Sequence, residues 1–198
     1  KVLTRLHVLL ALLTTVFGAS AMFTLYTYIA PSLVEFSHAS PTFITMMLVL
    51  IGIGFSIGNH FGGKFADLSI NKTLIGFLLL LISLMLIFPI LAQSQLGAAI
   101  GLVIWGSAAF AIVPPLQMRV MSVAHEASGL ASSVNIGAFN LGNVIGAAAG
   151  GAVLSFGLNY SAVSIIGAVL ASIGLILVVI QMKLASKTNL RLQQCPQV

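Results

Sequence analysis

The stretch GGKFADLSINK, residues 62–72, decides the fold of this protein because it brings charge into an otherwise apolar sequence. It holds two lysines and an aspartate, whereas only 6% of the 198 residues are charged. A soluble domain has roughly 25% charged residues, so this chain has too few to cover a surface that faces water. With a mean hydropathy of +1.15, the chain is expected to lie largely in lipid.

Long runs without charge flank this stretch, and a transmembrane helix needs ~20 such residues. Backbone groups in lipid must form hydrogen bonds within the protein, which a helix achieves within each segment. The sequence therefore predicts an all-α membrane protein, with residues 1–198 forming a single six-helix transmembrane domain and residues 183–198 a basic cytoplasmic tail. The predicted spans are about 8–30, 42–61, 73–92, 96–118, 129–154 and 162–182.

The basic residues predict how these spans are oriented. If the spans cross in order, the N-terminus, residues 62–72, residues 118–128 and the C-terminus share one side, and together they hold all 8 Lys and Arg residues. Basic residues favour the cytoplasmic side, so both termini are expected there. The net charge of +5 then records topology, and no nucleic-acid partner is expected. A cleaved signal peptide ending near residues 19–21 is the alternative for the first run.

The first and fourth spans carry polar or bulky side chains that are unusual in lipid. Ser20, Thr24 and Tyr28 recur every four residues and so share one helical face. They would either hydrogen-bond to a neighbouring helix or line a solute pathway. Pro114 and Pro115 are expected to break the fourth span, where Trp105 is either packed or part of a pathway wall.

The fifth span concentrates amides and small residues. Asn135, Asn140 and Asn143 fall within about half the helix circumference, so they predict either interhelical hydrogen bonds or the wall of a polar cavity. The predicted pathway residues are Thr24, Tyr26, Tyr28, Trp105, Gln117, Asn135, Asn140 and Asn143. Small residues at this spacing let helices approach closely. The predicted packing residues are Gly142, Gly146, Gly150 and Gly151.

Several classes of site are not indicated by this sequence. The four histidines lack the spacing of metal ligands, and no phosphate-binding loop or nucleophile elbow occurs. We therefore expect no enzyme activity, no cofactor and no metal. The predicted spans hold no acidic or basic residue in their cores, although ion-coupled pumps usually keep one there.

Residues 62–72 resemble the signature loop of the major facilitator superfamily, G-x-x-A-D-R-x-G-R-K. Gly63, Ala66, Asp67 and Lys72 match it, whereas positions 68, 70 and 71 depart from it. The segments TLYTYIAP and VPPLQMRVMSVAHEASGLASSVNIGAFNLGNVIGAAAGG also look like spans seven, ten and eleven of bacterial drug:proton antiporters, of the arabinose-efflux-permease-like group. The resemblance covers nearly the whole chain.

The resemblance implies one half of a twelve-helix transporter of the bacterial inner membrane, built from a 3+3 inverted repeat. The implied activity is efflux of a small organic solute, such as a drug, sugar or nucleoside, by proton antiport. The implied partners are a missing N-terminal six-helix half, which would hold the coupling residues, the lipid bilayer, the solute and protons. A membrane assembly subunit without transport activity, and a half-transporter that dimerises, are the alternatives.

The resemblance also implies a gate on the cytoplasmic side. Asp67 would pair with Arg119 or cap a helix of the other half, and these contacts would hold the cytoplasmic side shut in one state. The alternative is a solvated turn whose charges only fix topology. The predicted gate residues are Gly62, Gly63, Lys64, Ala66, Asp67, Lys72 and Arg119.

Overall fold

The structure, a computed structural model, describes the backbone of residues 2–194 and the side chains of residues 2–185. These residues form helices and no strand, so the all-α prediction is confirmed. Five of the helical segments are long and apolar enough to cross a membrane, and one of them, α3, folds back on itself. The elements are η1 Val2–Thr4, α1 Leu6–Thr27, α2 Ile29–Ser37, α3 Pro41–Leu91, α4 Gln95–Ala111, α5 Val113–Val123, η2 His125–Ala127, α6 Ser128–Ser155 and α7 Tyr160–Gln194.

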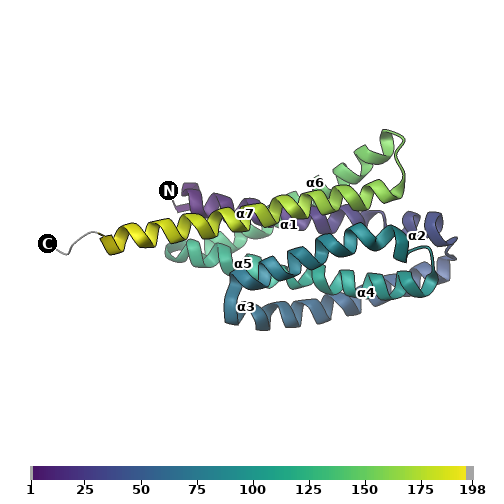
Figure 1. Ribbon diagram of the computed structural model, residues 1–198, viewed down its shortest axis with the longest axis horizontal. Helices are drawn as coiled ribbons and strands as arrows, with labels where there is room; N and C mark the ends of the chain where they lie inside the picture. Colours follow the sequence, from purple (N-terminus) through teal and green to yellow (C-terminus); the bar gives the residue numbers. More distant parts are fainter. Residues whose placement is uncertain (1, 195–198) are drawn as a thin grey trace.

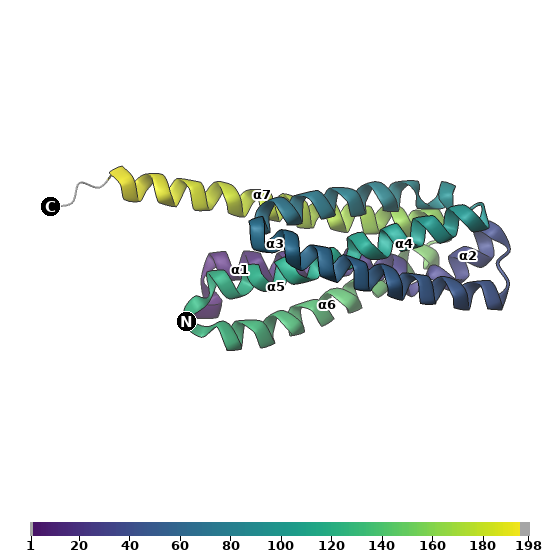
Figure 2. The same cartoon turned by 90° about the horizontal axis from the view of Figure 1, so that it is seen from below.

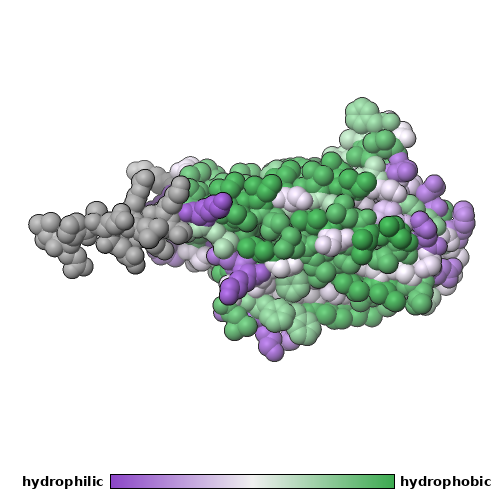
Figure 3. All heavy atoms as spheres, viewed as in Figure 1, coloured by the Kyte–Doolittle hydropathy of each residue, from purple (hydrophilic) through white to green (hydrophobic). Residues whose placement is uncertain are grey.

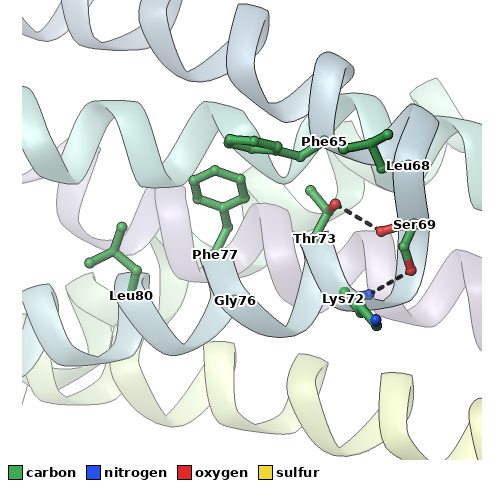
Figure 4. A pocket seen from close by; sticks show the side chains of 8 residues that line it. All are labelled: Phe65, Leu68, Ser69, Lys72, Thr73, Gly76, Phe77 and Leu80. Carbon is green, nitrogen blue, oxygen red and sulfur yellow. Dashed lines mark hydrogen bonds between the residues drawn. The ribbon is translucent and has the colours of Figure 1, made fainter.

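The turn inside α3 lies within residues 62–72. Ser69 alone leaves the helical conformation, with φ −166° and ψ 105°, and the chain reverses direction there (Figure 1). The Ser69 hydroxyl accepts a hydrogen bond from the Lys72 amide at 3.4 Å, and the Thr73 hydroxyl donates to the Ser69 carbonyl at 2.8 Å (Figure 4). We call residues 41–68 the first arm and residues 70–91 the second arm. The charged stretch is therefore largely helical, because a single extended residue is enough to turn the chain.

One end of the bundle collects the chain segments that were expected to share a side. The N-terminus, the Ser69 turn and the start of α6 lie together, and α7 runs out past them (Figures 1 and 2). Arg5 joins Glu126 there through two hydrogen bonds of 3.1 and 2.9 Å. The hydrogen bond to Glu126, and then its charge, raise the pKa of Arg5. We call this the termini end.

The surface agrees with a bundle embedded in lipid. Hydrophilic residues gather at the two ends of the molecule, and a broad apolar band lies between them (Figure 3). Large exposed hydrophobic residues occur along the helices, for example Val49 at 62% and Val144 at 66% exposure. Apolar side chains can remain on the outside of a membrane helix because lipid is as apolar as they are.

Two predicted spans are interrupted in the structure. α4 ends at Ala111 and α5 begins at Val113, with a proline in its first turn, so the break expected at Pro114 and Pro115 is confirmed. The first run is interrupted at Tyr28, and α2 continues it to Ser37, which lies beyond the predicted limit at residue 30.

Glycine ridges bring two pairs of helices into close contact. On α6, a Cβ added at Gly142 would meet the Val16 carbonyl oxygen of α1, and one added at Gly146 would meet the Ser20 carbonyl oxygen. α1 and α6 therefore pack backbone to backbone, as small residues at this spacing allow.

The second ridge lies on the first arm of α3. Added Cβ atoms at Gly54, Gly58 and Gly62 would meet backbone atoms of α4 at Val103, Ser107 and Ala111 respectively. Only Gly62 of this ridge was singled out in the sequence. The two ridges fix α1 against α6 and α3 against α4, and the candidate site lies where these pairs meet.

Candidate functional site

Four side chains form a chain of hydrogen bonds between α1, α5 and α6. The Thr15 hydroxyl donates to Asn135 Oδ1 at 2.7 Å, and Asn135 Nδ2 donates to Gln117 Oε1 at 2.6 Å. Gln117 Nε2 donates in turn to the Ser132 hydroxyl at 2.6 Å. We call Thr15, Gln117, Ser132 and Asn135 the polar cluster. Its members come from three helices, so these hydrogen bonds depend on how the three helices are rotated relative to one another.

Local structure places each member of the polar cluster. Ser132 and Asn135 are three residues apart on α6, so they share a face, and Gln117 lies in the second turn of α5, after the break at Ile112. Thr15 and Asn135 are 0% and 4% exposed. Burying an amide without a partner is costly, so these hydrogen bonds stabilise the arrangement.

A cavity of about 160 Å³ adjoins the polar cluster. Thr15, Gln117 and Asn135 line it together with apolar residues such as Phe139. Sites for drug-sized ligands measure about 300–1,000 Å³, so this cavity is too small for a whole drug-sized ligand. It has the composition of a binding wall, with a few polar groups on an apolar background.

An aromatic cluster lies next to it, made of Phe23, Tyr26, Phe55, Trp105, Phe110 and Phe139. Phe55 of α3 stacks on Phe110 of α4 with ring centroids 3.9 Å apart, and it lies 5.8 Å from Tyr26 of α1. Phe139 lies 6.1 Å from Phe23 and also lines the cavity of the polar cluster. The two clusters therefore form one continuous surface from five helices, α1, α3, α4, α5 and α6.

Two of the predicted pathway residues belong to the aromatic cluster, and they differ in how far they are buried. Tyr26 is 38% exposed, whereas Trp105 is 0% exposed. The Trp105 indole lies 6.3 Å from Phe55, and its Nε1 has no hydrogen-bond partner. Tyr26 is therefore open on one side, whereas Trp105 is packed beneath the surface beside Phe55.

Thr24 and Tyr28 lie in the contact between α1 and α6. The Thr24 hydroxyl donates to the Ser20 carbonyl oxygen at 2.7 Å, and the Tyr28 hydroxyl donates to the Ala147 carbonyl oxygen at 2.9 Å. The Tyr28 ring also lies over Gly150 and Gly151. Both side chains take part in helix packing here, and a place in the pathway stays a prediction for them.

Asn140 and Asn143 lie farther along α6. Asn143 Nδ2 donates to Asn140 Oδ1 at 3.5 Å, and Asn140 is exposed. The Oδ1 atom of Asn143 is enclosed without a hydrogen-bond partner. Among the described side chains no hydrogen bond connects this pair to the polar cluster, so the predicted asparagine stripe divides into two parts.

The predicted gate residues divide by exposure. Lys64, Asp67 and Lys72 are exposed, whereas Ala66 is buried. A Cβ added at Gly63 would meet nothing within 4 Å, so the close packing expected there falls on Gly62.

Lys72 also borders an apolar pocket between the two arms of α3 (Figure 4). Arg119 is buried on α5. Within residues 2–185 the salt bridge is that of Arg5 and Glu126, and no ion pair joins Arg119 to Asp67.

Several of these site residues were not predicted from the sequence. Phe55 and Phe110 are ordinary residues in apolar runs, and Thr15 lies outside the stripe of Ser20, Thr24 and Tyr28. The four-residue spacing of Gly54, Gly58 and Gly62 was visible and would have predicted the contact with α4. Within the described part of the chain, no group of three His, Cys, Asp or Glu could hold a metal ion.

Comparison with known proteins identifies relatives of this chain. It is 67% identical over 177 residues to the inner membrane transport protein YdhP of Escherichia coli (strain K12), which covers 89% of this chain and 46% of that protein. It is 34% identical to the uncharacterized MFS-type transporter YfhI of Bacillus subtilis (strain 168), over 86% of this chain and 43% of that protein.

A third relative is named for a substrate class. The chain is 32% identical to a protein named "Probable sugar efflux transporter" of Haemophilus influenzae (strain PittGG), over 83% of this chain and 41% of that protein. The chain thus spans just under half the length of these relatives. No protein-family model matches it.

Proposed function

The chain is homologous to bacterial inner-membrane transporters of the major facilitator superfamily, and from that relationship we propose that it works as the C-terminal half of a secondary transporter. The transporter exports a small organic solute by proton antiport with alternating access. The six apolar segments are the two arms of α3 and the four spans built from α1, α4–α5, α6 and α7. In this proposal they form a 3+3 inverted repeat, and the termini end faces the cytoplasm.

The continuous surface of the polar and aromatic clusters carries this proposal. Hydrogen-bonding amides from α5 and α6 lie beside the exposed Tyr26 ring of α1 and the half-buried Phe55 ring of α3, away from the ends of the bundle. A solute with both apolar faces and hydroxyl or amide groups fits such a wall. A relative named for sugar efflux supports this substrate class.

The other half of the transporter completes the site in this proposal. The cavity beside the polar cluster is about 160 Å³, which is too small for a whole solute, so a facing wall must enlarge it. That half also supplies the carboxylate for proton coupling, because no acidic residue lies in the core of the spans of this chain. Within the described residues Asp67 is exposed at the end of the first arm, where it can contact the facing half as a cytoplasmic gate.

The test is a transport assay on the intact protein in everted membrane vesicles with an imposed proton gradient. Radiolabelled pentoses, hexoses and nucleosides are screened first for gradient-dependent uptake, which corresponds to efflux from the cell. Asn135→Ala is then expected to weaken uptake by about tenfold or more, since it removes a hydrogen-bonding group from the site and leaves Gln117 Oε1 without its donor.

Ser83→Ala is the matched control, because Ser83 is exposed on the second arm and its hydroxyl bonds only the Leu79 carbonyl oxygen. If Asn135→Ala transports as well as the wild type, the polar cluster is not the binding wall. If no solute is moved and the protein copurifies instead with a stable membrane complex, the assembly-subunit alternative replaces this proposal.

The gate has a separate test. Asp67→Asn in the intact protein is expected to change the rate of transport and the balance between inward-open and outward-open states, read from site-specific fluorescence labels on the two halves. Unchanged transport together with an unchanged balance would leave Asp67 as a solvated turn residue.

A further inference from the structure

A second polar cavity lies at the termini end. It has a volume of about 230 Å³ and is formed by α1, the second arm of α3, α5 and α7. It shares no lining residue with the cavity of the polar cluster. Its polar lining residues are His7, Asn71, Arg119, Ser122 and Gln181.

Arg119 is the unusual member of this lining. It is only 7% exposed, and its Nη1 atom is enclosed without a hydrogen-bond partner. None of the residues that line the cavity is acidic. A buried cation without a counter-charge is costly, so a group that neutralises Arg119 would stabilise the fold.

The remaining walls offer donors for an anion and exclude a large ligand. The side chain of Gln181 donates to the Thr14 hydroxyl at 3.3 Å, which holds α7 against α1. Asn71 and His7 add further N–H groups, and Ile70 and Met182 close the walls with apolar surface. At about 230 Å³ the cavity is smaller than sites for drug-sized ligands, so a compact polar group suits it.

We propose that this cavity binds a phosphate group, held by the guanidinium of Arg119 and the side-chain amide of Asn71. A guanidinium matches phosphate oxygens with two parallel hydrogen bonds. Basic pockets between membrane helices on the cytoplasmic side also suit the head groups of anionic lipids. The phosphate comes from such a head group or from free phosphate, and the occupied site ties α5 to α3 and α7.

The experiment measures thermal stability of the intact protein in a neutral maltoside detergent. Phosphatidylglycerol is compared with phosphatidylcholine at equal mole fraction, and inorganic phosphate with chloride at equal ionic strength. Native mass spectrometry counts the bound phosphatidylglycerol. The wild-type protein is expected to gain stability from phosphatidylglycerol or from phosphate. The Arg119→Gln variant is expected to bind the stabilising probe about tenfold or more weakly.

Lys72→Gln is the matched control, because Lys72 lies at the same end but is exposed and outside this cavity. It is expected to bind like the wild type. Protection by phosphatidylglycerol alone assigns the site to a lipid head group, and protection by inorganic phosphate assigns it to a soluble anion.

Equal protection of wild type and Arg119→Gln, or no protection of wild type by either probe, would overturn the proposal. Arg119→Gln removes a buried unpaired charge, so without either probe it is expected to be at least as stable as the wild type. Arg119→Lys is a second variant that keeps the charge and loses the paired geometry, and it should bind with intermediate strength.

Discussion

Asn135 uses both ends of its amide, accepting from Thr15 and donating to Gln117. With 4% exposure it has little access to water, so each of these partners replaces a lost hydrogen bond to solvent. Removing only one partner of such a hydrogen bond lowers the stability of the fold more than replacing both partners by apolar groups. This asymmetry makes the polar cluster testable by stability as well as by transport.

Gln117→Leu and Asn135→Leu are each expected to lower the melting temperature by roughly 2–12 °C, since each takes one hydrogen bond away from a partner that is buried or half-buried. The double variant is expected to recover part of that loss, because both amides are then absent. Scanning fluorimetry of the purified intact protein measures all three. Strictly additive losses would mean that the two side chains act independently.

The helices of this protein are positioned by contacts between backbones. Gly58 of α3 and Gly146 of α6 face carbonyl groups of α4 and α1 so closely that an added methyl group would overlap them. Each contact involves a helix that carries a site residue, since Phe55 follows Gly54 on α3 and Asn135 lies on the same helix as Gly146. Wider helix separations would therefore move the rings and amides apart.

Gly58→Ala is expected to lower the melting temperature by roughly 2–12 °C, because the new methyl group meets the backbone of Ser107 and overpacking of this kind is destabilising. Gly52→Ala is its control on the same helix, since a Cβ there meets nothing within 4 Å. A smaller loss for Gly58→Ala than for Gly52→Ala would contradict the close packing of α3 on α4.

The break between α4 and α5 has a different consequence. Pro114→Ala together with Pro115→Ala restores two backbone donors and favours one continuous helix. We expect the melting temperature to stay the same or rise while transport falls, because a straightened α5 turns Gln117 away from Ser132 and Asn135. Transport in everted vesicles and scanning fluorimetry are measured on the same preparation. Unchanged transport would show that the break does not position Gln117.

The whole molecule has an apolar band between two polar ends, and the two ends differ in charge. Arg5, Lys64, Lys72 and Lys183 lie on segments that reach the termini end, whereas Glu35 lies on α2 at the opposite end. Basic residues favour the cytoplasmic side of a membrane. The proposed orientation therefore follows from the distribution of charge over the entire bundle.

This orientation predicts which residues can be labelled from each side. Lys64→Cys and Glu35→Cys are introduced singly into the intact protein after its own cysteines, including Cys195, have been replaced. A maleimide that does not cross membranes should label position 35 in spheroplasts and position 64 in everted vesicles, since both positions are exposed. The reverse pattern would invert the topology and place the termini end outside the cytoplasm.

Much of the fold could be predicted from local sequence, and much less of the site. The apolar runs predicted an all-helical chain and the double proline predicted the break before α5, because hydropathy and the missing proline donor act within one segment. Gln117 and Asn135 were singled out because amides are rare in lipid. Phe55 and Thr15 were not, because neither a phenylalanine nor a threonine stands out in a membrane helix.

The sequence by itself determined that this protein is a bundle of apolar helices, and it determined which segments share an end, since length, hydropathy and charge are properties of the chain alone. Only the tertiary structure decided which polar groups meet. Thr15 and Asn135 are 120 residues apart, and their hydrogen bond depends on the rotation and close approach of α1 and α6. Only the tertiary structure enclosed Arg119, because four separate helices form the walls around it.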